Sequence, residues 1–210
     1  YLPRADPRDA LVGLSLAELS PGARVASGSV RRRAQLAWLR PDLTFEDLRG
    51  NIGSRLGKVP VGGAVVVAMA ALDRLGLSAR AAQVLSPSEM LPQVGQGAVA
   101  LCCRAEDEDV LALLALVDDP ITRRAVAAER AWLAAVGGGC DLPVGAYCTA
   151  AGDRLELEAM IASLDGHVVV RSRLGGGDPA ELGAALAADL LDRGGRSLLP
   201  QPPGTESLLP

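Results

Sequence analysis

The stretch Gly137-Gly138-Gly139-Cys140-Asp141-Leu142-Pro143-Val144-Gly145 divides the chain into two parts with different patterns. Before it, residues 121–136 have the apolar spacing of a helix, and three consecutive glycines predict where that helix ends, because glycine has no preferred backbone conformation. Pro143 cannot continue a helix, so we expect Cys140 to lie on a mobile loop. A small cysteine beside a glycine-rich turn is more often inert core filling than a functional thiol, so the rest of the chain has to decide between the two.

The part of the chain before this stretch has the pattern of an α/β fold. Strands are expected at residues 10–12, 24–27, 43–48, 65–69 and 98–103, and helices at residues 31–39, 70–75 and 107–116. The run at residues 65–69 is continuously apolar, which is typical of a strand buried on both faces of a parallel sheet. Strand, loop and helix follow one another three times. We therefore predict an α/β lobe with a mainly parallel sheet, similar to the lobes of periplasmic binding proteins.

The part after the stretch has a different order of elements. Strands are expected at residues 144–149, 155–163 and 168–173, and Asp165-Gly166 is a hairpin-turn signal. Asp178 is placed to cap a helix that begins at Pro179. This order indicates a small C-terminal α+β domain with a three-stranded antiparallel sheet.

These patterns divide the chain into four segments. The α/β lobe covers residues 1–91, and a crossover between lobes, with the returning part of a further lobe, covers residues 92–117. The C-terminal α+β domain covers residues 118–196, and a proline-rich tail covers residues 197–210. The boundary before residue 118 rests on the helix-breaking sequence Asp118-Asp119-Pro120.

The composition excludes several classes of protein. The 210 residues carry a formal net charge of −4, which argues against a general nucleic-acid binder. His167 is the only histidine, so we expect neither a His-dependent triad nor a metal site. No apolar run reaches membrane-spanning length, and the four cysteines have no CxxC spacing. We expect a reduced, soluble, cytoplasmic monomer that binds neither nucleic acid nor a membrane.

An arginine-rich turn is the first signal for a ligand site. In Ser27-Gly28-Ser29-Val30-Arg31-Arg32, a strand ends, serine hydroxyls form the turn and a helix begins. Backbone N–H groups at a helix N-terminus bind anions, whereas arginines in the first turn oppose the helix dipole. Their presence there favours a site for a negatively charged ligand. A solvated basic face and a DNA-reading helix are the alternatives.

Two more segments carry glycines next to polar side chains. Arg49-Gly50-Asn51 together with Arg55 could hold carboxylates, because glycine allows close approach and guanidinium binds carboxylates bidentately. Ion pairs with Glu46 or Asp47 explain these arginines equally well. The segment Val94-Gly95-Gln96-Gly97-Ala98 is too short for a dinucleotide fingerprint and fits a crossing between two lobes.

Taken in order, these motifs resemble those of the hydroxymethylbilane synthase family, also called porphobilinogen deaminase. Seven motifs carry the resemblance: Arg4-Ala5-Asp6-Pro7-Arg8-Asp9-Ala10, Ser27-Gly28-Ser29-Val30-Arg31-Arg32, Arg49-Gly50-Asn51 with Ser54-Arg55-Leu56, Arg74-Leu75-Gly76, Val94-Gly95-Gln96-Gly97-Ala98, Ala128-Glu129-Arg130-Ala131, and Gly138-Gly139-Cys140 with Pro143-Val144. They extend over most of the chain and follow the family's order.

The resemblance implies a transferase of tetrapyrrole (heme) biosynthesis. Such an enzyme condenses four molecules of porphobilinogen into hydroxymethylbilane and releases ammonia at each addition. Cys140 would carry a dipyrromethane cofactor through a thioether, as the covalent primer of the growing oligopyrrole. Each pyrrole unit brings an acetate and a propionate, so a cavity rich in arginine fits the chemistry.

The resemblance also implies roles for particular residues. The expected catalytic residues are Cys140, Arg31, Arg32, Arg49 and Arg55. The expected cofactor-binding residues are Cys140, Ser27, Ser29, Arg31, Arg32, Arg55, Arg74 and Gln96.

The chain departs from the family pattern at several places. Gly28 stands where the family has a serine, Gly137 stands where it usually has a glutamate, and the loop after Lys58 is shorter. The family's first lobe, with its catalytic aspartate, precedes the position that matches Tyr1, so we expect the native protein to be longer. The alternative is a catalytically inactive fragment, or a module that binds a small polycarboxylate. A thiol enzyme is disfavoured, because a neighbouring aspartate should raise the pKa of the Cys140 thiol.

Overall fold

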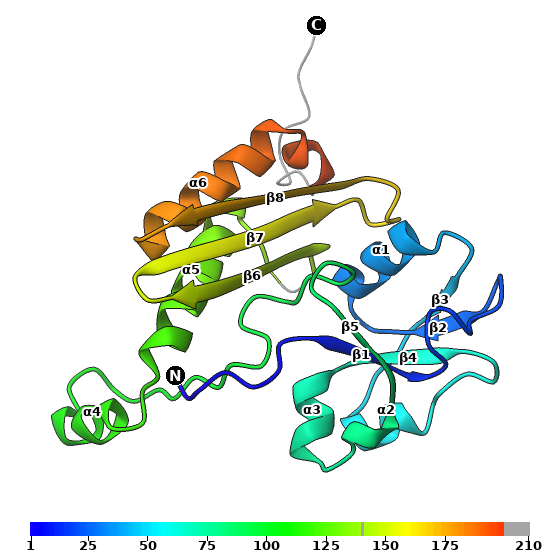
Figure 1. Ribbon diagram of the computed structural model, residues 1–210, viewed down its shortest axis with the longest axis horizontal. Coiled ribbons are helices and arrows are strands. Elements are labelled where there is room, and N and C mark those ends of the chain that lie inside the picture. Colours follow the sequence, from blue (N-terminus) through cyan, green and yellow to red (C-terminus); the bar gives the residue numbers. More distant parts are fainter. Residues whose placement is uncertain (140, 200–210) are drawn as a thin grey trace, which may run out of the picture.

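The computed structural model describes residues 1–139 and 141–199, and its elements form two sheets with helices around them (Figure 1). The elements of the first part are β1 (Asp9–Gly13), β2 (Arg24–Ala26), α1 (Val30–Leu39), β3 (Thr44–Glu46), α2 (Ile52–Leu56), β4 (Ala64–Ala68), α3 (Met69–Arg74), the 3-10 helix η1 (Ser78–Arg80) and β5 (Ala81–Leu85). The elements of the second part are α4 (Glu108–Ala115), α5 (Pro120–Val136), β6 (Val144–Ala151), β7 (Arg154–Ala162), β8 (Val169–Gly176), α6 (Pro179–Asp192) and the 3-10 helix η2 (Gly195–Leu198).

The first sheet has five strands in the order β3-β2-β4-β1-β5. Strand β2 pairs in parallel with β3 and β4, whereas β1 pairs antiparallel with both β4 and β5. Strand β5 therefore runs in the same direction as β2, β3 and β4, and β1 alone is reversed. The prediction of an α/β lobe with a mainly parallel sheet is confirmed.

Both faces of this sheet are buried, because successive side chains of β1 enter different clusters. Ala10 and Val12 pack with Val65 on one face, and Leu11 packs with Val66 on the other. A central strand that is apolar on both faces is typical of a sheet covered on each side. The sheet therefore has a separate hydrophobic core on each face.

One strand was missed by the sequence analysis and one was wrongly expected. Strand β5 was not predicted, because Ala-Ala-Gln-Val-Leu has little β-branched character. It forms a strand because it pairs with β1, with Leu85 opposite Asp9. Residues 98–103 were expected to form a strand, but they have no regular secondary structure. In the described part of the chain no strand pairs with them, and Leu101 is 43% exposed.

The second sheet has the order β6-β7-β8 with antiparallel pairing throughout, as predicted. Helices α5 and α6 cover one face, and Trp132, Leu157 and Leu186 meet in the core between them (Figure 1). The two helices pack closely at Gly183, where a Cβ atom would come within 2.6 Å of the Trp132 backbone nitrogen. This part is the expected α+β domain.

Helix α5 begins and ends where the sequence indicates. Asp119 caps its N-terminus by accepting from the Thr122 N–H at 2.6 Å. Gly137 ends it in the left-handed region at φ +74°, which glycine adopts without steric cost. The predicted end of the helix is confirmed, whereas Cys140 lies outside the described residues.

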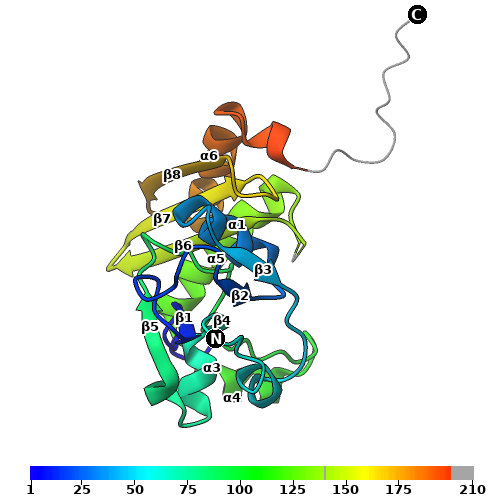
Figure 2. The ribbon, with the colours of Figure 1, turned by 90° about the vertical axis from the view of Figure 1, so that its right-hand side faces the viewer.

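Helix α4 stands apart from both sheets in the two views of the ribbon (Figures 1 and 2). None of its residues is buried, and Leu113 and the adjoining Leu116 are 63% and 81% exposed. Within residues 1–139 and 141–199, no helix combines the length and the hydropathy needed to cross a bilayer.

Candidate functional site

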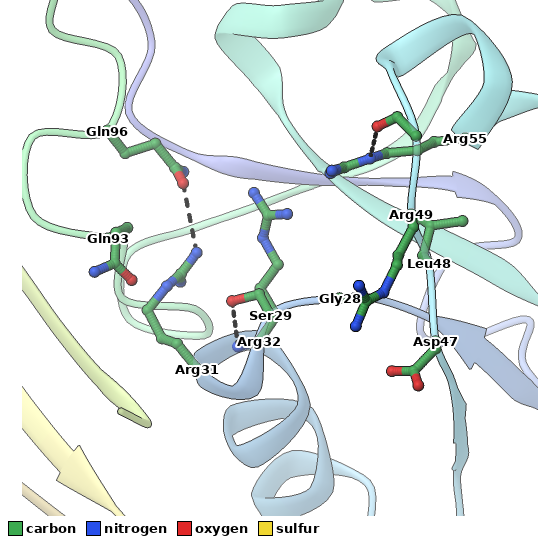
Figure 3. Close-up of a pocket in the computed structure, with 11 residues that line it drawn as sticks. Gly28, Ser29, Arg31, Arg32, Asp47, Leu48, Arg49, Arg55, Gln93 and Gln96 are labelled. Carbon is green, nitrogen blue, oxygen red and sulfur yellow. Dashed lines mark hydrogen bonds between the residues drawn. The ribbon is translucent and has the colours of Figure 1, made fainter. Parts of the chain in front are cut away.

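A cavity of about 510 Å³ lies at the edge of the first sheet where β2 and β3 end. It is lined by Gly28, Ser29, Arg31, Arg32, Asp47, Leu48, Arg49, Gly50, Arg55, Gln93 and Gln96 (Figure 3). Open α/β sheets bind ligands outside the carboxyl ends of their parallel strands, because loops from several strands meet there. The cavity is therefore in the position expected for a ligand site.

The turn after β2 brings two arginines into this cavity. Ser29 is the N-cap of α1 and its hydroxyl accepts from the Arg32 N–H at 3.4 Å. Arg31 and Arg32 lie in the first turn of the helix and extend towards the segment that carries Gln96 (Figure 3). The arginines are thus held at the helix N-terminus, where the backbone dipole adds to their positive charge.

Asp9, which is buried behind the cavity lining, binds both of these arginines. Its Oδ2 accepts from Arg31 Nη2 at 2.8 Å, and its Oδ1 accepts from Arg32 Nη2 at 2.7 Å and Nε at 3.0 Å. Burial alone would raise the pKa of the Asp9 carboxyl, but Arg31 and Arg32 outweigh it and hold the pKa below its usual value. Burial also lowers the pKa of Arg31, yet a guanidinium remains charged in proteins.

Arg31 makes further contacts that leave part of its head group without a partner. Its Nη1 donates to the Leu91 carbonyl at 2.5 Å, and its Nη2 lies 3.4 Å from Gln96 Oε1. Its Nε is buried and has no hydrogen-bond partner among the described residues. An unpaired buried donor is costly, and this one belongs to a residue that lines the cavity.

Arg49 and Arg55 approach the cavity from the side opposite to Arg31 (Figure 3). Arg55 uses its Nε to bind the Gly50 carbonyl at 2.8 Å. Among the described residues, its two terminal nitrogens and the whole Arg49 guanidinium form no hydrogen bond. These donors can therefore bind an incoming carboxylate without breaking an existing bond.

Among the described residues, Arg49 and Arg55 do not form the structural ion pairs that were the alternative explanation for them. Glu46 pairs with Arg24 at 2.8 Å, and Asp47 pairs with Arg33. The two acids that could have neutralised Arg49 and Arg55 are thus bound to other arginines.

Two glycines shape the walls around these arginines. A Cβ atom on Gly28 would come within 2.6 Å of the Leu48 carbonyl oxygen, so no side chain fits at this point of the turn. A Cβ atom on Gly145, at the start of β6, would come within 3.0 Å of the Leu91 carbonyl oxygen and 3.3 Å of Arg31 Cδ. The segment that follows Cys140 in sequence therefore packs directly against an arginine of the cavity.

The structure brings together most of the residues expected from the sequence. Six of them line the cavity: Ser29, Arg31, Arg32, Arg49, Arg55 and Gln96. Ser27 is buried behind the turn, where its hydroxyl accepts from the Ser29 N–H at 3.3 Å, and Arg74 is exposed at the end of α3, away from the lining. The cofactor contacts and catalytic roles expected of all these residues, including Ser27, Arg74 and Cys140, stay predictions.

Sequence reasoning did not assign three residues that the structure places at the site. Gln93 and Asp47 line the cavity, and Asp9 lies beneath it. The signal for Asp9 was present, because it is an acid joined directly to the buried apolar run of β1. No local pattern marks Gln93 or Asp47. In the described part of the chain, no group of three or more His, Cys, Asp or Glu side chains is placed to hold a metal ion.

Comparison with known proteins gives matches along nearly the whole chain. Residues 1–112 match the family model described as "Porphobilinogen deaminase, dipyromethane cofactor binding domain", and residues 123–192 match "Porphobilinogen deaminase, C-terminal domain". Every residue that lines the cavity falls within the first match.

Curated relatives carry the same name. The chain is 53% identical over 202 residues to the porphobilinogen deaminase of Roseiflexus castenholzii, which covers 93% of the chain and 67% of that relative. It is 49% identical over 213 residues to that of Acidothermus cellulolyticus (96% and 64%) and 41% identical over 203 residues to that of Bacillus subtilis (93% and 65%). The chain thus spans about two thirds of the length of these relatives.

Proposed function

Since this chain belongs to the porphobilinogen deaminase family, we propose that it forms the cofactor-binding and C-terminal parts of a hydroxymethylbilane synthase. The enzyme would condense four porphobilinogen molecules into a linear tetrapyrrole, and water would release it as hydroxymethylbilane by supplying the hydroxyl group. Each addition would form a bond between an aminomethyl carbon and a pyrrole carbon, with loss of a pyrrole ring proton and departure of the amino group as ammonia.

The observation that carries this proposal is the cavity with four arginines at the carboxyl edge of the sheet. Porphobilinogen and its oligomers carry one acetate and one propionate for every pyrrole ring. Arg49 and Arg55 offer donors with no protein partner among the described residues, and each charged hydrogen bond to a carboxylate contributes roughly 1.5–3 kcal/mol. A ligand with several carboxylates thus matches the number and the direction of these donors.

The residues of the cavity also fit a dipyrromethane, whose two rings bring four carboxylates. Ser29, Arg31, Arg32, Arg55 and Gln96, all of which line the cavity, would hold it. When bound, a dipyrromethane supplies the primer to which substrate units are added. The arginines would neutralise its carboxylates and keep them in fixed positions.

The position of β6 supports attachment of this group to Cys140. Gly145 lies against Arg31, which lines the cavity, and it is five positions after Cys140 in the sequence. A fully extended segment of that length spans at most about 18 Å, so a thioether at Cys140 would be within reach of the cavity. Forming that thioether joins Sγ to a pyrrole methylene carbon, and the thiol proton leaves with the displaced amino group.

The second candidate is a binding module for a small polycarboxylate. The same arginines favour it, because their geometry selects carboxylates and not a particular carbon skeleton. The two candidates differ in the need for Cys140, since simple binding does not require a covalent bond.

Intact-mass analysis of the protein expressed from its natural gene, in cells that make porphobilinogen, tests the proposal. We expect a mass above that of the polypeptide by two pyrrole units, and loss of the extra mass in Cys140→Ser. Cys102→Ser is the matched control, because Cys102 is exposed and lies away from the cavity lining. An unmodified mass, together with citrate binding that is unchanged in Cys140→Ser, would instead support the binding module.

A further inference from the structure

Asp9 is a carboxylate that is contacted by three side chains of the cavity lining. Its carboxylate accepts four hydrogen bonds from three side chains: one from Arg31, two from Arg32, and one from Gln96 Nε2 at 3.0 Å. The residue is completely buried and does not line the cavity. It therefore touches the residues that would meet a ligand without meeting the ligand itself.

The reversed direction of β1 brings this carboxylate to the ligand edge. Asp9 is the first residue of β1 and pairs in register with Ala68 at the end of β4 and with Leu85 at the end of β5. A strand parallel to its neighbours would place its first residue at the opposite edge of the sheet. Because β1 alone is antiparallel, its N-terminal acid lies beside the carboxyl ends from which Arg31 and Arg32 follow.

Two neighbouring guanidinium groups that are this deeply buried need a negatively charged partner. The side chain of Arg31 is 2% exposed and that of Arg32 is 11% exposed, so water screens their repulsion weakly. Asp9 leaves the pair with a net charge of +1 and ties one edge of each head group. Arg31 Nη1 also donates to the Leu91 carbonyl, and Arg32 Nη1 donates to the Val66 carbonyl at 3.3 Å, so both head groups are held in a constant direction.

We propose that Asp9 is a positioning residue, which orients Arg31 and Arg32 so that both head groups bind carboxylates of one ligand. The proposal rests on the anionic ligand of the proposed function, but not on the reaction. Asp9 has two opposing effects: its charge weakens attraction for an anion, whereas its hydrogen bonds align the donors. The four bonds at 2.7–3.0 Å indicate that alignment is the larger effect.

Isothermal titration calorimetry with Asp9→Asn tests this. The full chain is used with Cys140→Ser, which keeps a tethered group out of the cavity, and the probes are citrate and porphobilinogen. We expect Asp9→Asn to weaken the binding of each probe at least tenfold, even though the variant has lost a negative charge. Equal or tighter citrate binding would overturn the proposal, since it would show that Asp9 only reduces the positive charge.

The matched control is Glu129→Gln. Glu129 is also a completely buried carboxylate bound to an arginine, Arg4, but it lies outside the cavity lining. At a temperature where both variants are folded, we expect Glu129→Gln to change citrate affinity less than twofold. A similar loss in both variants would mean that Asp9 acts only through general stability, and the proposal would be wrong.

A double-mutant cycle shows whether Asp9 acts through Arg32. We expect Arg32→Lys and Asp9→Asn each to weaken citrate binding, and the double variant to be weakened by less than the product of the two factors. Independent effects, with factors that multiply, would contradict the proposal.

If Asp9→Asn does not fold, arginine-selective NMR of the protein with aspartate at position 9 gives the answer. The Nε–H signals of Arg31 and Arg32, assigned with single Arg→Lys variants, should be protected from solvent exchange before and after citrate is added. An Arg32 head group that moves freely without citrate would overturn the proposal.

The two probes separate this inference from the proposed function. If the chain binds citrate but not porphobilinogen, the proposed function fails and Asp9 is judged on citrate alone. If porphobilinogen binds and Asp9→Asn leaves both affinities unchanged, the function holds and the role of Asp9 fails. Binding of neither probe would overturn both.

Discussion

Arg4 and Glu129 lie 125 positions apart in the sequence and form a buried ion pair, with Arg4 Nη1 2.5 Å from Glu129 Oε1. The same carboxylate accepts from the Gly95 N–H at 2.7 Å and from the Cys148 N–H at 2.9 Å. It therefore joins the N-terminal segment, the segment around Gly95 and strand β6 to helix α5. Arg4 adds a cation–π contact, with its guanidinium carbon 5.0 Å from the centre of the Tyr147 ring.

Glu129→Gln should lower stability substantially, because it leaves the Arg4 charge buried without its partner. Removing one member of a buried ion pair costs about 3–5 kcal/mol. For a protein of this size that corresponds to a fall in Tm of about 6–20 °C. Thermal unfolding followed by circular dichroism measures it.

The control for this prediction is Glu156→Gln, which removes an exposed acid that pairs with Arg173 at 2.8 Å. Exposed pairs contribute about 0–1 kcal/mol, so its Tm should change by only a few degrees. Equal shifts in the two variants would mean that the Glu129 network does not join the parts of the chain.

Gly28→Ser would introduce the serine that the family has at this position, and we expect it to be harmful here. The new Cβ would lie 2.6 Å from the Leu48 carbonyl oxygen, so the turn or β3 must shift. Overpacking of this kind costs about 1–3 kcal/mol, and urea unfolding would show it. The control is Gly177→Ser, where the nearest atom is 3.8 Å from a Cβ; a Gly28→Ser variant as stable as this control would contradict the prediction.

Arg55→Gln should weaken the binding of citrate by about tenfold to a hundredfold, because it removes charged donors worth roughly 1.5–3 kcal/mol. Stability should change little, since the only protein contact of this head group in the described part of the chain is with the Gly50 carbonyl. Arg24→Gln, an exposed arginine paired with Glu46, serves as control and should change the affinity less than twofold. Unchanged affinity in Arg55→Gln would remove it from the site.

Cys148 and Cys102 should differ strongly in their reaction with iodoacetamide. Burial and the nearby Glu129 raise the pKa of the Cys148 thiol to about 12, whereas Cys102 is exposed. Because the thiolate is the reactive form, peptide mass spectrometry after brief labelling at pH 8 should find Cys102 modified and Cys148 unmodified. In urea both should react. Labelling of Cys148 in the native protein would show that the buried region around Glu129 is open to solvent.

The contribution of Asp9 to stability should disappear at low pH. The folded protein holds the pKa of this carboxyl below its ordinary value, so the unfolded chain binds the proton more readily than the folded one does. Stability from Asp9 is then fully present above about pH 4 and is lost as the pH falls further. Urea unfolding of Asp9→Asn and the original protein at pH 7, 4 and 3 should show a difference that shrinks on acidification. A difference that is the same at all three values would contradict this.

Much of the fold follows from local patterns in the chain. The helices at α1, α5 and α6 were predicted from apolar spacing and, for α6, from the cap Asp178, which acts within one turn; the cap Asp119 of α5 came only from the structure. Strand β5 was missed and a strand at residues 98–103 was wrongly expected. In both cases the outcome depends on whether a distant strand is present to pair, and local propensity does not contain that information.

The sequence predicted which arginines belong to the candidate site, but not which acids they bind. Arg31, Arg32, Arg49 and Arg55 were identified from glycine-rich turns and from resemblance, and the cavity gathers all four. The sequence left open whether acids neutralise them. The structure shows that Arg31 and Arg32 share one buried carboxylate, whereas the acids nearest to Arg49 are bound to other arginines.

The amino-acid sequence by itself determined which segments become helices, which turns carry arginine and which family the motifs resemble, because these properties depend on neighbours a few residues apart. Only the tertiary structure decided that Asp9 lies under the arginine pair and that Arg4 reaches Glu129. The physical reason is that both contacts depend on long-range pairing: one on the antiparallel placement of β1 between β4 and β5, the other on the packing of the N-terminal segment against α5.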